Sequence, residues 1–332
     1  MSHPRAFHTA TRLQDGRVLI CGGDAEIYDP STETFIPTGS IVTQRSFHAA
    51  TLLADGKVLL TGGRGVVFNL LSGAEIYDPV SNSFTAVSNM GTAREKHTAV
   101  LLSDGRVLIA GGSGADGDSL TSAEIFDPAT RTFSSTGAMN VRRTSCTATR
   151  LADGKVLIVG GGTSGPENDL DYSSEIFNPQ TGTFALAGRT QYWRGSHTVN
   201  TLPSGKVLIA GGLSLGFTEL YDPASGAFSI AASLVTARFS QTATSLADSV
   251  VIAGGVTLTY EFLSSIETYD DSLGAFRETG SLITPRAGHT ATALMNGKIL
   301  ICGGITTGPV ALASAELYSV EPAILRHRSV HH

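Results

Sequence analysis

The stretch DGRVLIAGG, residues 104–112, is a short apolar run that follows an Asp-Gly turn signal and ends in two glycines. Closely similar stretches occur six more times in the 332-residue chain: DGRVLICGG (15–23), DGKVLLTGG (55–63), DGKVLIVGG (153–161), SGKVLIAGG (204–212), DSVVIAGG (248–255) and NGKILICGG (296–304). Self-similarity at a period of 40 to 51 residues means that one supersecondary unit is used again and again. The repeat therefore governs the fold more strongly than any single residue does.

Each repeat predicts four short strands. The third repeat begins with an arginine and small residues (REKHTAVLL, from Arg94), and the Asp-Gly turn and the Gly-Gly strand follow. An Asp-Gly pair between apolar runs is a strong hairpin signal. A Glu-x-aromatic strand comes next, as in EIYDP at 75–79, and a phenylalanine such as Phe84 stands seven residues beyond the aromatic. In the last repeat Leu325 replaces that phenylalanine, so we expect the seventh outer strand to be degenerate.

Four antiparallel strands repeated seven times predict an all-β, seven-bladed β-propeller that forms a single domain over residues 1–332. The small residues of the arginine-led strand suit the narrow central channel, and the bulky aromatic columns suit the wider space between blades. The expected blades span residues 5–44, 45–93, 94–142, 143–193, 194–237, 238–285 and 286–328.

These motifs, taken together, resemble the kelch repeat family, in which apolar residues precede a double glycine and spaced aromatic residues follow. Phenylalanine stands here where the family usually has tryptophan, and the resemblance covers essentially the whole chain. Kelch domains are six- or seven-bladed propellers, which are often closed by a blade with strands from both termini. Because this chain starts on a first strand and ends near a fourth, we expect each blade to come from one repeat.

Composition and charge limit the partners. The formal net charge is −6 and the chain has no basic block, so we expect no nucleic-acid partner. No apolar run approaches the roughly 20 residues that span a bilayer, so we expect no membrane partner. The three cysteines are interpreted as free thiols. We expect a monomer, and the composition leaves both the cytoplasm and the cell exterior open.

Three columns of polar residues recur once per blade: seven arginines, seven glutamates and five histidines. Periodic charges favour a structural interpretation, in which arginine and glutamate are paired or hydrogen-bonded between blades. The histidines are expected to hydrogen-bond to neighbouring backbone rather than to bind a metal. In some kelch proteins the arginine column lines the ligand pocket, so the resemblance keeps Arg45, Arg94 and Arg194 as candidates.

The loops after Gly-Gly and the segments leading into each arginine share one face, and the Gly-Gly loops vary in length. Variable loops on a rigid scaffold are where binding residues usually lie. All ten aromatic residues outside the two packing columns fall in these segments, and aromatic side chains with arginine are favoured at interfaces. The predicted ligand-binding residues are Arg64, Phe68, Tyr172, Tyr192, Trp193, Arg194, Phe217, Tyr260, Phe262, Arg45 and Arg94.

The same loops carry two acidic clusters, Asp116 with Asp118 and a second one between Glu167 and Asp171, which match no known calcium-loop pattern. We predict no catalytic residue, no metal site and no cofactor. The function that the pattern favours is a non-catalytic module that recognises a protein segment or a glycan on the long-loop face. The alternative is a propeller enzyme acting on a sugar or another small molecule, mutarotase-like or lyase-like. A copper oxidase resembling galactose oxidase is disfavoured because no tyrosine occurs two residues after the repeat arginines.

Overall fold

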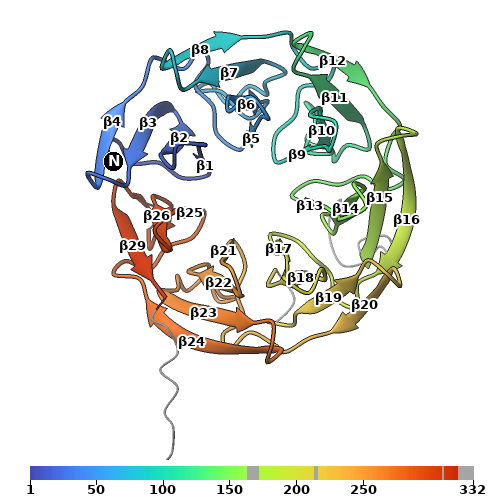
Figure 1. Ribbon diagram of the computed structural model, residues 1–332, viewed down its shortest axis with the longest axis vertical. Coiled ribbons are helices and arrows are strands. Elements are labelled where there is room, and N and C mark those ends of the chain that lie inside the picture. The colour runs from blue at the N-terminus through green and yellow to red at the C-terminus, as the bar shows by residue number, and fades with distance from the viewer. Residues whose placement is uncertain (163–171, 213–215, 309, 321–332) are drawn as a thin grey trace, which may run out of the picture.

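The protein is a ring of seven β-sheets around a central axis (Figure 1). The computed structural model describes residues 1–162, 172–212, 216–308 and 310–320. Each sheet is built from strands that follow one another in the sequence, so the predicted seven-bladed, all-β propeller is confirmed. Over these described ranges, the chain forms no helix with the length and apolar character needed to cross a membrane.

Four concentric sets of strands make up the ring. The innermost strands are β1 (Thr9–Arg12), β5 (Ala49–Leu52), β9 (Thr98–Leu101), β13 (Thr147–Arg150), β17 (Thr198–Thr201), β21 (Thr242–Ser245) and β25 (Thr290–Ala293). The second strands are β2 (Val18–Gly22), β6 (Val58–Thr61), β10 (Val107–Ala110), β14 (Val156–Val159), β18 (Val207–Ala210), β22 (Ser249–Ala253) and β26 (Lys298–Cys302). The third strands are β3 (Asp24–Asp29), β7 (Ala74–Asp78), β11 (Ala123–Asp127), β15 (Ser173–Asn178), β19 (Glu219–Asp222), β23 (Ser265–Asp270) and β29 (Ala315–Ser319). The outer strands are β4 (Thr34–Pro37), β8 (Ser83–Ala86), β12 (Thr132–Ser135), β16 (Thr183–Arg189), β20 (Ala227–Ile230) and β24 (Ala275–Ser281).

The second strand of each blade is apolar on both faces because a blade lies on either side of it. In β10, Val107 and Ile109 pack into a cluster with β6 and β7 of the preceding blade. Leu108 and Ala110, which point the opposite way, pack with β14 of the following blade. A strand buried on both faces reads as a continuous apolar run instead of an alternating one. The repeated VLI motif is therefore the consequence of ring closure.

The two aromatic columns pair directly across the third and fourth strands. Tyr77 lies opposite Phe84 in the β7–β8 register, with ring centroids 4.8 Å apart and the rings tilted by 45°. The same tilted pair occurs in six blades, with centroids 4.8 to 5.1 Å apart. Such pairs add about 0.5–1.5 kcal/mol beyond the apolar area that they bury. They fill the wide outer space between neighbouring blades.

The Gly-Gly pair is a joint between neighbouring blades. The second glycine donates its N–H to the carbonyl oxygen of the arginine that opens the next blade, as Gly112 does to Arg143 at 2.8 Å. In every blade except the first, the first glycine has positive φ, and a Cβ on Gly111 would come within 2.6 Å of the same carbonyl oxygen. Only glycine combines this backbone conformation with such close approach. The donor–acceptor pairs are Gly23–Arg45, Gly63–Arg94, Gly112–Arg143, Gly161–Arg194, Gly212–Arg238, Gly255–Arg286 and Gly304–Arg5.

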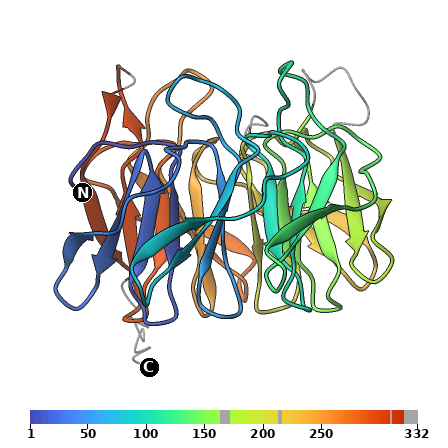
Figure 2. The same cartoon turned by 90° about the horizontal axis from the view of Figure 1, so that it is seen from above.

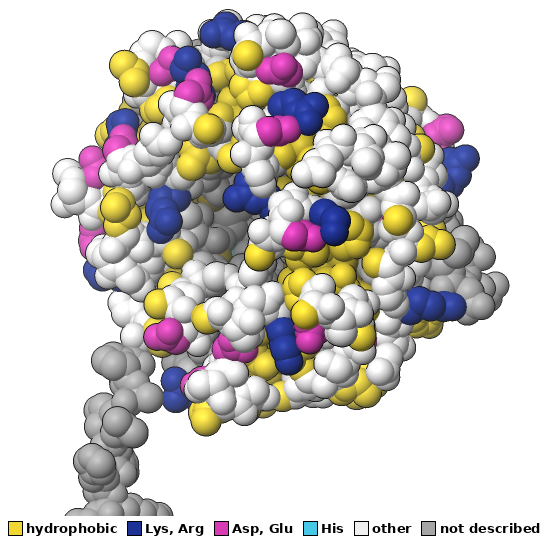
Figure 3. Space-filling view, turned by 45° about the vertical axis from the view of Figure 1, so that its right-hand side comes forward, with side chains coloured by type: hydrophobic (Ala, Val, Ile, Leu, Met, Phe, Trp, Pro, Cys, Tyr) yellow, Lys and Arg dark blue, Asp and Glu magenta, His cyan; other side chains and the backbone are white. Residues whose placement is uncertain are grey.

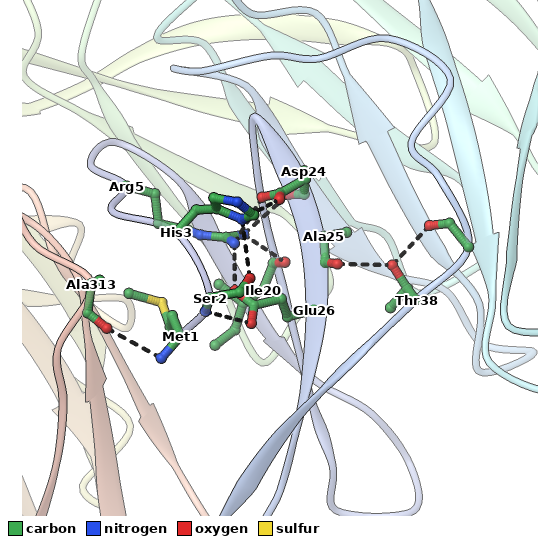
Figure 4. Close-up of polar contacts among 11 residues, drawn as sticks. Met1, Ser2, His3, Arg5, Ile20, Asp24, Ala25, Glu26, Thr38 and Ala313 are labelled. Carbon is green, nitrogen blue, oxygen red and sulfur yellow. Dashed lines mark hydrogen bonds and ion pairs between the residues drawn. The ribbon is translucent and has the colours of Figure 1, made fainter.

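The seventh blade closes the ring through this same joint, and the N-terminal residues reinforce the closure (Figure 4). The N-terminal amino group of Met1 donates to the carbonyl of Ala313 at 3.1 Å, and Arg5 N donates to Leu312 O at 3.1 Å. Within the described residues this blade has three strands, β25, β26 and β29. The predicted outer strand around Leu325 lies outside those residues. A two-stranded hairpin, β27 (Ile305–Thr306) and β28 (Val310–Ala311), rises from blade 7 on the long-loop face, which is uppermost in Figure 2.

Candidate binding site at the channel mouth

The arginine and glutamate columns form seven ion pairs, one inside each blade. In six of them the nitrogen–oxygen distance is 2.5 to 3.1 Å, and Arg94, Arg143, Arg194, Arg238 and Arg286 are fully buried. The pairs are Arg5–Glu26, Arg45–Glu75, Arg94–Glu124, Arg143–Glu175, Arg194–Glu219, Arg238–Glu267 and Arg286–Glu316.

Blade 4 shows how each pair works. Arg143 Nη1 donates to the carbonyls of Gly160 and Ser173, at 2.8 and 3.0 Å. Glu175 accepts from Arg143 and from the backbone N–H groups of Asn140 and Val141, which arrive from blade 3. The ion pair itself is internal to the blade, and the expected hydrogen bonds between blades are those that the glutamate accepts from the preceding linker.

The five column histidines hold neighbouring blades together through threonine hydroxyls rather than through the expected backbone groups. His97 Nε2 lies 2.9 Å from Thr61 Oγ1 of the preceding blade, and His8 Nε2 lies 3.0 Å from Thr290 Oγ1 across the closure. Burial, together with the nearby Arg94 and Arg45 charges, lowers the pKa of His97 from 6.5 to about 3. These imidazoles are therefore neutral at physiological pH.

A second ring of residues surrounds the mouth of the central channel on the long-loop face. These residues stand two positions after the repeat arginines, and all have φ between 52° and 58°. Their backbones are linked around the ring by N–H···O bonds of 2.9 to 3.2 Å at six of the seven junctions. A non-glycine residue in this conformation costs about 1 kcal/mol or more. The ring comprises Phe7, Phe47, Lys96, Ser145, Ser196, Ser240 and Gly288.

This ring is chemically uneven. Phe7 stacks on Phe47 with centroids 4.5 Å apart and planes 24° from parallel, and its ring covers Gly288, where a Cβ would lie 2.7 Å from Phe7. Lys96 Nζ lies 5.0 Å from the centroid of Phe47. Three consecutive positions of the ring are serines, Ser145, Ser196 and Ser240. The rim therefore combines an aromatic side, one cation and a side of hydroxyl groups.

The ring lines a hollow of about 410 Å³, together with His197, Gln241 and His289. This volume lies within the range of about 300–1,000 Å³ that small-molecule sites occupy. Lys96 is the charged side chain of this lining, because burial lowers the pKa of His197 and of His289 to about 3. Among the described residues that line the hollow there is no carboxylate.

Arg64, a predicted ligand residue, lies just outside this ring. Its guanidinium forms two hydrogen bonds with the carboxylate of Glu95, Nε–Oε2 at 2.7 Å and Nη2–Oε1 at 2.6 Å. The Glu95 side chain is only 5% exposed, whereas that of Arg64 is 37% exposed. Arg64 thus neutralises the carboxylate that precedes Lys96 in the chain.

Two other predicted residues stand at the tips of short hairpins above the same face. Phe68 and Tyr260 are each 78% exposed, with φ of 60° and 61°. Gly117 and Gly308 have positive φ in the corresponding loops of blades 3 and 7. Phe262 forms a backbone bridge with Val256 at the base of the blade 6 hairpin.

The other predicted aromatic residues, Tyr172, Tyr192, Trp193 and Phe217, belong to blades 4 and 5. Tyr192 stacks on Phe217 with centroids 4.2 Å apart and planes 9° from parallel, and Arg194 lies 5.8 Å from the Tyr192 ring. Tyr172 and Trp193 are half-buried, and the carbonyl of Tyr172 accepts from Thr190 N at 2.8 Å.

Arg45, Arg94 and Arg194 contribute buried guanidinium groups to the scaffold, with at most 3% of each residue exposed. Their side chains point into their blades and do not line the channel mouth. None of the eleven predicted residues is among the residues that line the hollow. The sequence signal that could have found the mouth is the variation of one position among Phe, Lys, Ser and Gly while the surrounding columns stay constant.

The hollows on the opposite face have a different character. They have volumes of about 340 to 460 Å³ and repeat between the tight turns of neighbouring blades. Charges at these turns are paired within the turn, as in Arg106–Asp104 at 2.7 Å and Lys155–Asp153 at 2.9 Å. On the face drawn in Figure 3, basic side chains likewise lie beside acidic ones and form no extended area of one charge. Features that recur in this way belong to blade packing.

One acidic loop is described in full. Asp116 Oδ1 accepts from the backbone N–H of Asp118 at 3.1 Å, which is a local turn. The second cluster, at Glu167 to Asp171, lies outside the described residues. Across the parts of the chain that the structure describes, no three His, Cys, Asp or Glu side chains converge as a metal site would require.

Comparison with known proteins identifies the repeat. Residues 96–140, which run from the channel mouth of blade 3 to the linker of blade 4, match the family model described as the Kelch motif. This repeat is thus a kelch motif, within a ring of seven blades built on the same pattern. The kelch propeller matches none of the curated protein sequences.

A solved structure similar to this kelch propeller is a fungal alcohol oxidase of the AA5 family in complex with copper. The TM-score is 0.76 at 18% identity, over 96% of this chain and 75% of that one. At this identity the similarity shows the fold alone. The described lining of the channel mouth does not fit a copper ion, since it offers no tyrosine, cysteine or carboxylate and the Nε2 atoms of its two histidines are already bonded to Thr147 and Thr242.

Proposed function

We propose that this kelch propeller is a non-catalytic carbohydrate-binding module whose ligand enters the channel mouth on the long-loop face. The observation that carries the proposal is the Phe7–Phe47 stack facing three serines across a hollow of about 410 Å³. A sugar ring has one face of C–H groups and a periphery of hydroxyls. An aromatic face suits the former, and hydroxyl groups, which both donate and accept, suit the latter.

The serine hydroxyls of the rim are available for hydrogen bonds to a ligand. Ser145, Ser196 and Ser240 are half-buried, and within the described structure none of their hydroxyl groups is hydrogen-bonded to protein. The backbone of the ring is fixed by its own hydrogen bonds, so the side chains need little reordering on binding. Preorganised groups of this kind raise affinity because less conformational entropy is lost.

The lining also supports binding rather than turnover. General acid–base catalysis needs a group that exchanges protons near the working pH. Burial lowers the pKa of His197 and of His289 to about 3, and the lining residues that the structure describes include no carboxylate. The mutarotase-like or lyase-like alternative would need such a group.

A protein segment is the second candidate ligand, and one observation favours it. The blade 2 hairpin exposes Val66, Val67 and Phe68 by 71%, 82% and 78%. The arginines argue against a protein ligand, because interfaces combine aromatic residues with accessible arginines. Arg64 is bonded to Glu95, and the other predicted arginines, Arg45, Arg94 and Arg194, are buried.

The test is a glycan array and a peptide library probed with the wild-type protein and with the double variant F7S/F47S. Serine occupies the same ring position in three blades, so this change is compatible with the backbone. We expect glycan binding that the double variant abolishes and that the matched hairpin variant F68S retains. Peptide binding lost in F68S, with no glycan bound, would overturn the proposal in favour of a protein ligand.

A further inference from the structure

Among the residues that the structure describes, no carboxylate is paired with the cation at the channel mouth. Lys96 is exposed, and its ammonium group lies over Phe47 rather than beside a carboxylate. Its sequence neighbour Glu95 is buried and bonded through both oxygens to Arg64. Within the described part of the chain, the mouth therefore carries one positive charge without a paired carboxylate, in a protein whose formal net charge is −6.

The rest of the lining leaves this charge unchanged. The imidazoles of His197 and His289 are neutral because burial lowers their pKa to about 3, and Gln241 and the serines are uncharged. The Lys96 side chain also occupies a backbone position with φ of 52°, where serine stands in three other blades. A long cationic side chain is held there although the fold requires neither its length nor its charge.

The geometry of the mouth favours a carboxylate over a phosphate. A lysine that binds phosphate acts as a point charge beside arginine forks or several free backbone N–H groups, which supply the remaining contacts to the phosphate oxygens. Here the N–H groups of Phe7, Phe47, Lys96, Ser145, Ser240 and Gly288 donate to the carbonyls of the ring itself. One ammonium group with nearby hydroxyls matches the single charge of a carboxylate.

We propose that the channel mouth is specific for an acidic sugar unit, with Lys96 binding its carboxylate. The Phe7–Phe47 stack packs against the apolar face of the sugar ring, and the serines bond to its hydroxyls. This inference rests on the proposed carbohydrate binding and adds to it the charge of the ligand and the residue that selects it. Lys96 is thus the specificity-determining residue of the site.

The experiment is calorimetric titration with two matched pairs of probes: methyl galactosiduronate, with its free carboxylate, against methyl galactoside, and methyl glucosiduronate against methyl glucoside. At low salt we expect the acidic member of at least one pair to bind about tenfold or more tightly than its neutral counterpart. This preference should shrink in 0.5 M salt, since mobile ions screen an exposed charge pair.

The variant K96S reproduces the residue found at this position in blades 4, 5 and 6, so we expect it to fold normally. Its acidic-to-neutral affinity ratio should fall to about one while binding of the neutral sugar persists. The control K206Q, which removes an exposed lysine on the turn face, should keep the wild-type ratio. The variant S240K, which adds a second cation to the rim, should raise the ratio.

Three other outcomes would each overturn part or all of this proposal. Equal binding of acidic and neutral sugars by the wild-type protein would overturn the charge specificity and leave carbohydrate binding intact. A preference for acidic sugars that K96S retains would overturn the role of Lys96. Binding of a poly-glutamate peptide, with no sugar bound, would overturn both the inference and the carbohydrate function.

Discussion

The backbone N–H of Gly304 donates to the carbonyl oxygen of Arg5, 2.9 Å away, and so joins the last blade to the first. The same bond joins the six other pairs of neighbouring blades, so the ring closes through the bond that the repeat uses elsewhere, and the amino group of Met1 adds a bond to Ala313. Because no blade can bury both of its apolar faces alone, the stability of each blade depends on this joint. The Gly-Gly motif and the buried arginine are the two parts of that joint.

Replacing Gly303 by alanine should therefore destabilise the protein by about 2–4 kcal/mol, through backbone strain and a steric clash. Gly303 has φ of 59°, and its Cβ would lie 2.4 Å from Arg5 O. Gly297 is the matched control, because it has φ of 82° and no atom within 4 Å of its Cβ position. G297A should cost only the backbone strain, about 1–2 kcal/mol. Equal losses in urea denaturation would contradict the role of the close approach.

The buried ion pairs should be far more sensitive than the exposed ones. Arg143 and Glu175 are both fully buried and 3.1 Å apart, so R143M leaves a buried carboxylate without its cation. We expect a loss of about 3–5 kcal/mol in the free energy of unfolding. The control R106M removes a partly exposed pair with Asp104 and should cost less than about 1 kcal/mol. A small loss for R143M would mean that the pair is dispensable.

Stability should fall as the pH is lowered from 6.5 towards 3. Burial depresses the pKa of His8, His97, His197 and His289 to about 3 in the folded protein. Between this value and 6.5 the unfolded chain takes up protons that the folded chain does not, so each histidine lowers stability by up to about 1.4 kcal/mol per pH unit. Above pH 6.5 this dependence should vanish.

The variant H97Q tests the assignment of this pH dependence. Gln241 occupies the same column in blade 6, where its Nε2 donates to Ala210 O at 2.9 Å, so glutamine is compatible with the position. Denaturant unfolding at pH 7, 6 and 5 should show a smaller slope for H97Q than for the wild-type protein. An unchanged slope would assign the pH dependence to other groups.

The exposed tip aromatics should contribute little to stability. In F68G and Y260G the relief of positive φ and the greater freedom of glycine in the unfolded chain offset each other. Because both side chains are 78% exposed, we expect changes within about 0.5 kcal/mol. A larger loss in thermal or urea unfolding would show that these rings pack against the rim.

The sequence predicted the features that repeat. Tyr77 and Phe84 stand seven residues apart in one repeat, and the same spacing in the other repeats predicted two aromatic columns that the structure pairs across adjacent strands. The recurrence of Arg143 and Glu175 once per blade predicted paired charges. The period and the spacing contain this information because every blade packs against its neighbours in the same way.

The direction of a side chain was not predictable in the same way. Whether Arg94 points into its blade or towards the channel depends on which carbonyls lie within reach, and Gly111 O and Ser122 O supply them at 2.7 and 3.0 Å. The channel mouth was missed for a related reason. Phe47 and Lys96 become neighbours only when the ring closes, since 49 positions separate them in the sequence.

The measurement that tests the central claim most directly is the titration of the wild-type protein and F7S/F47S with sugars, with the fold verified by circular dichroism. The structure predicts saturable binding of one sugar per wild-type chain and its loss in the double variant. Binding that survives removal of both rings, in a folded protein, would place the site elsewhere and contradict recognition at the channel mouth.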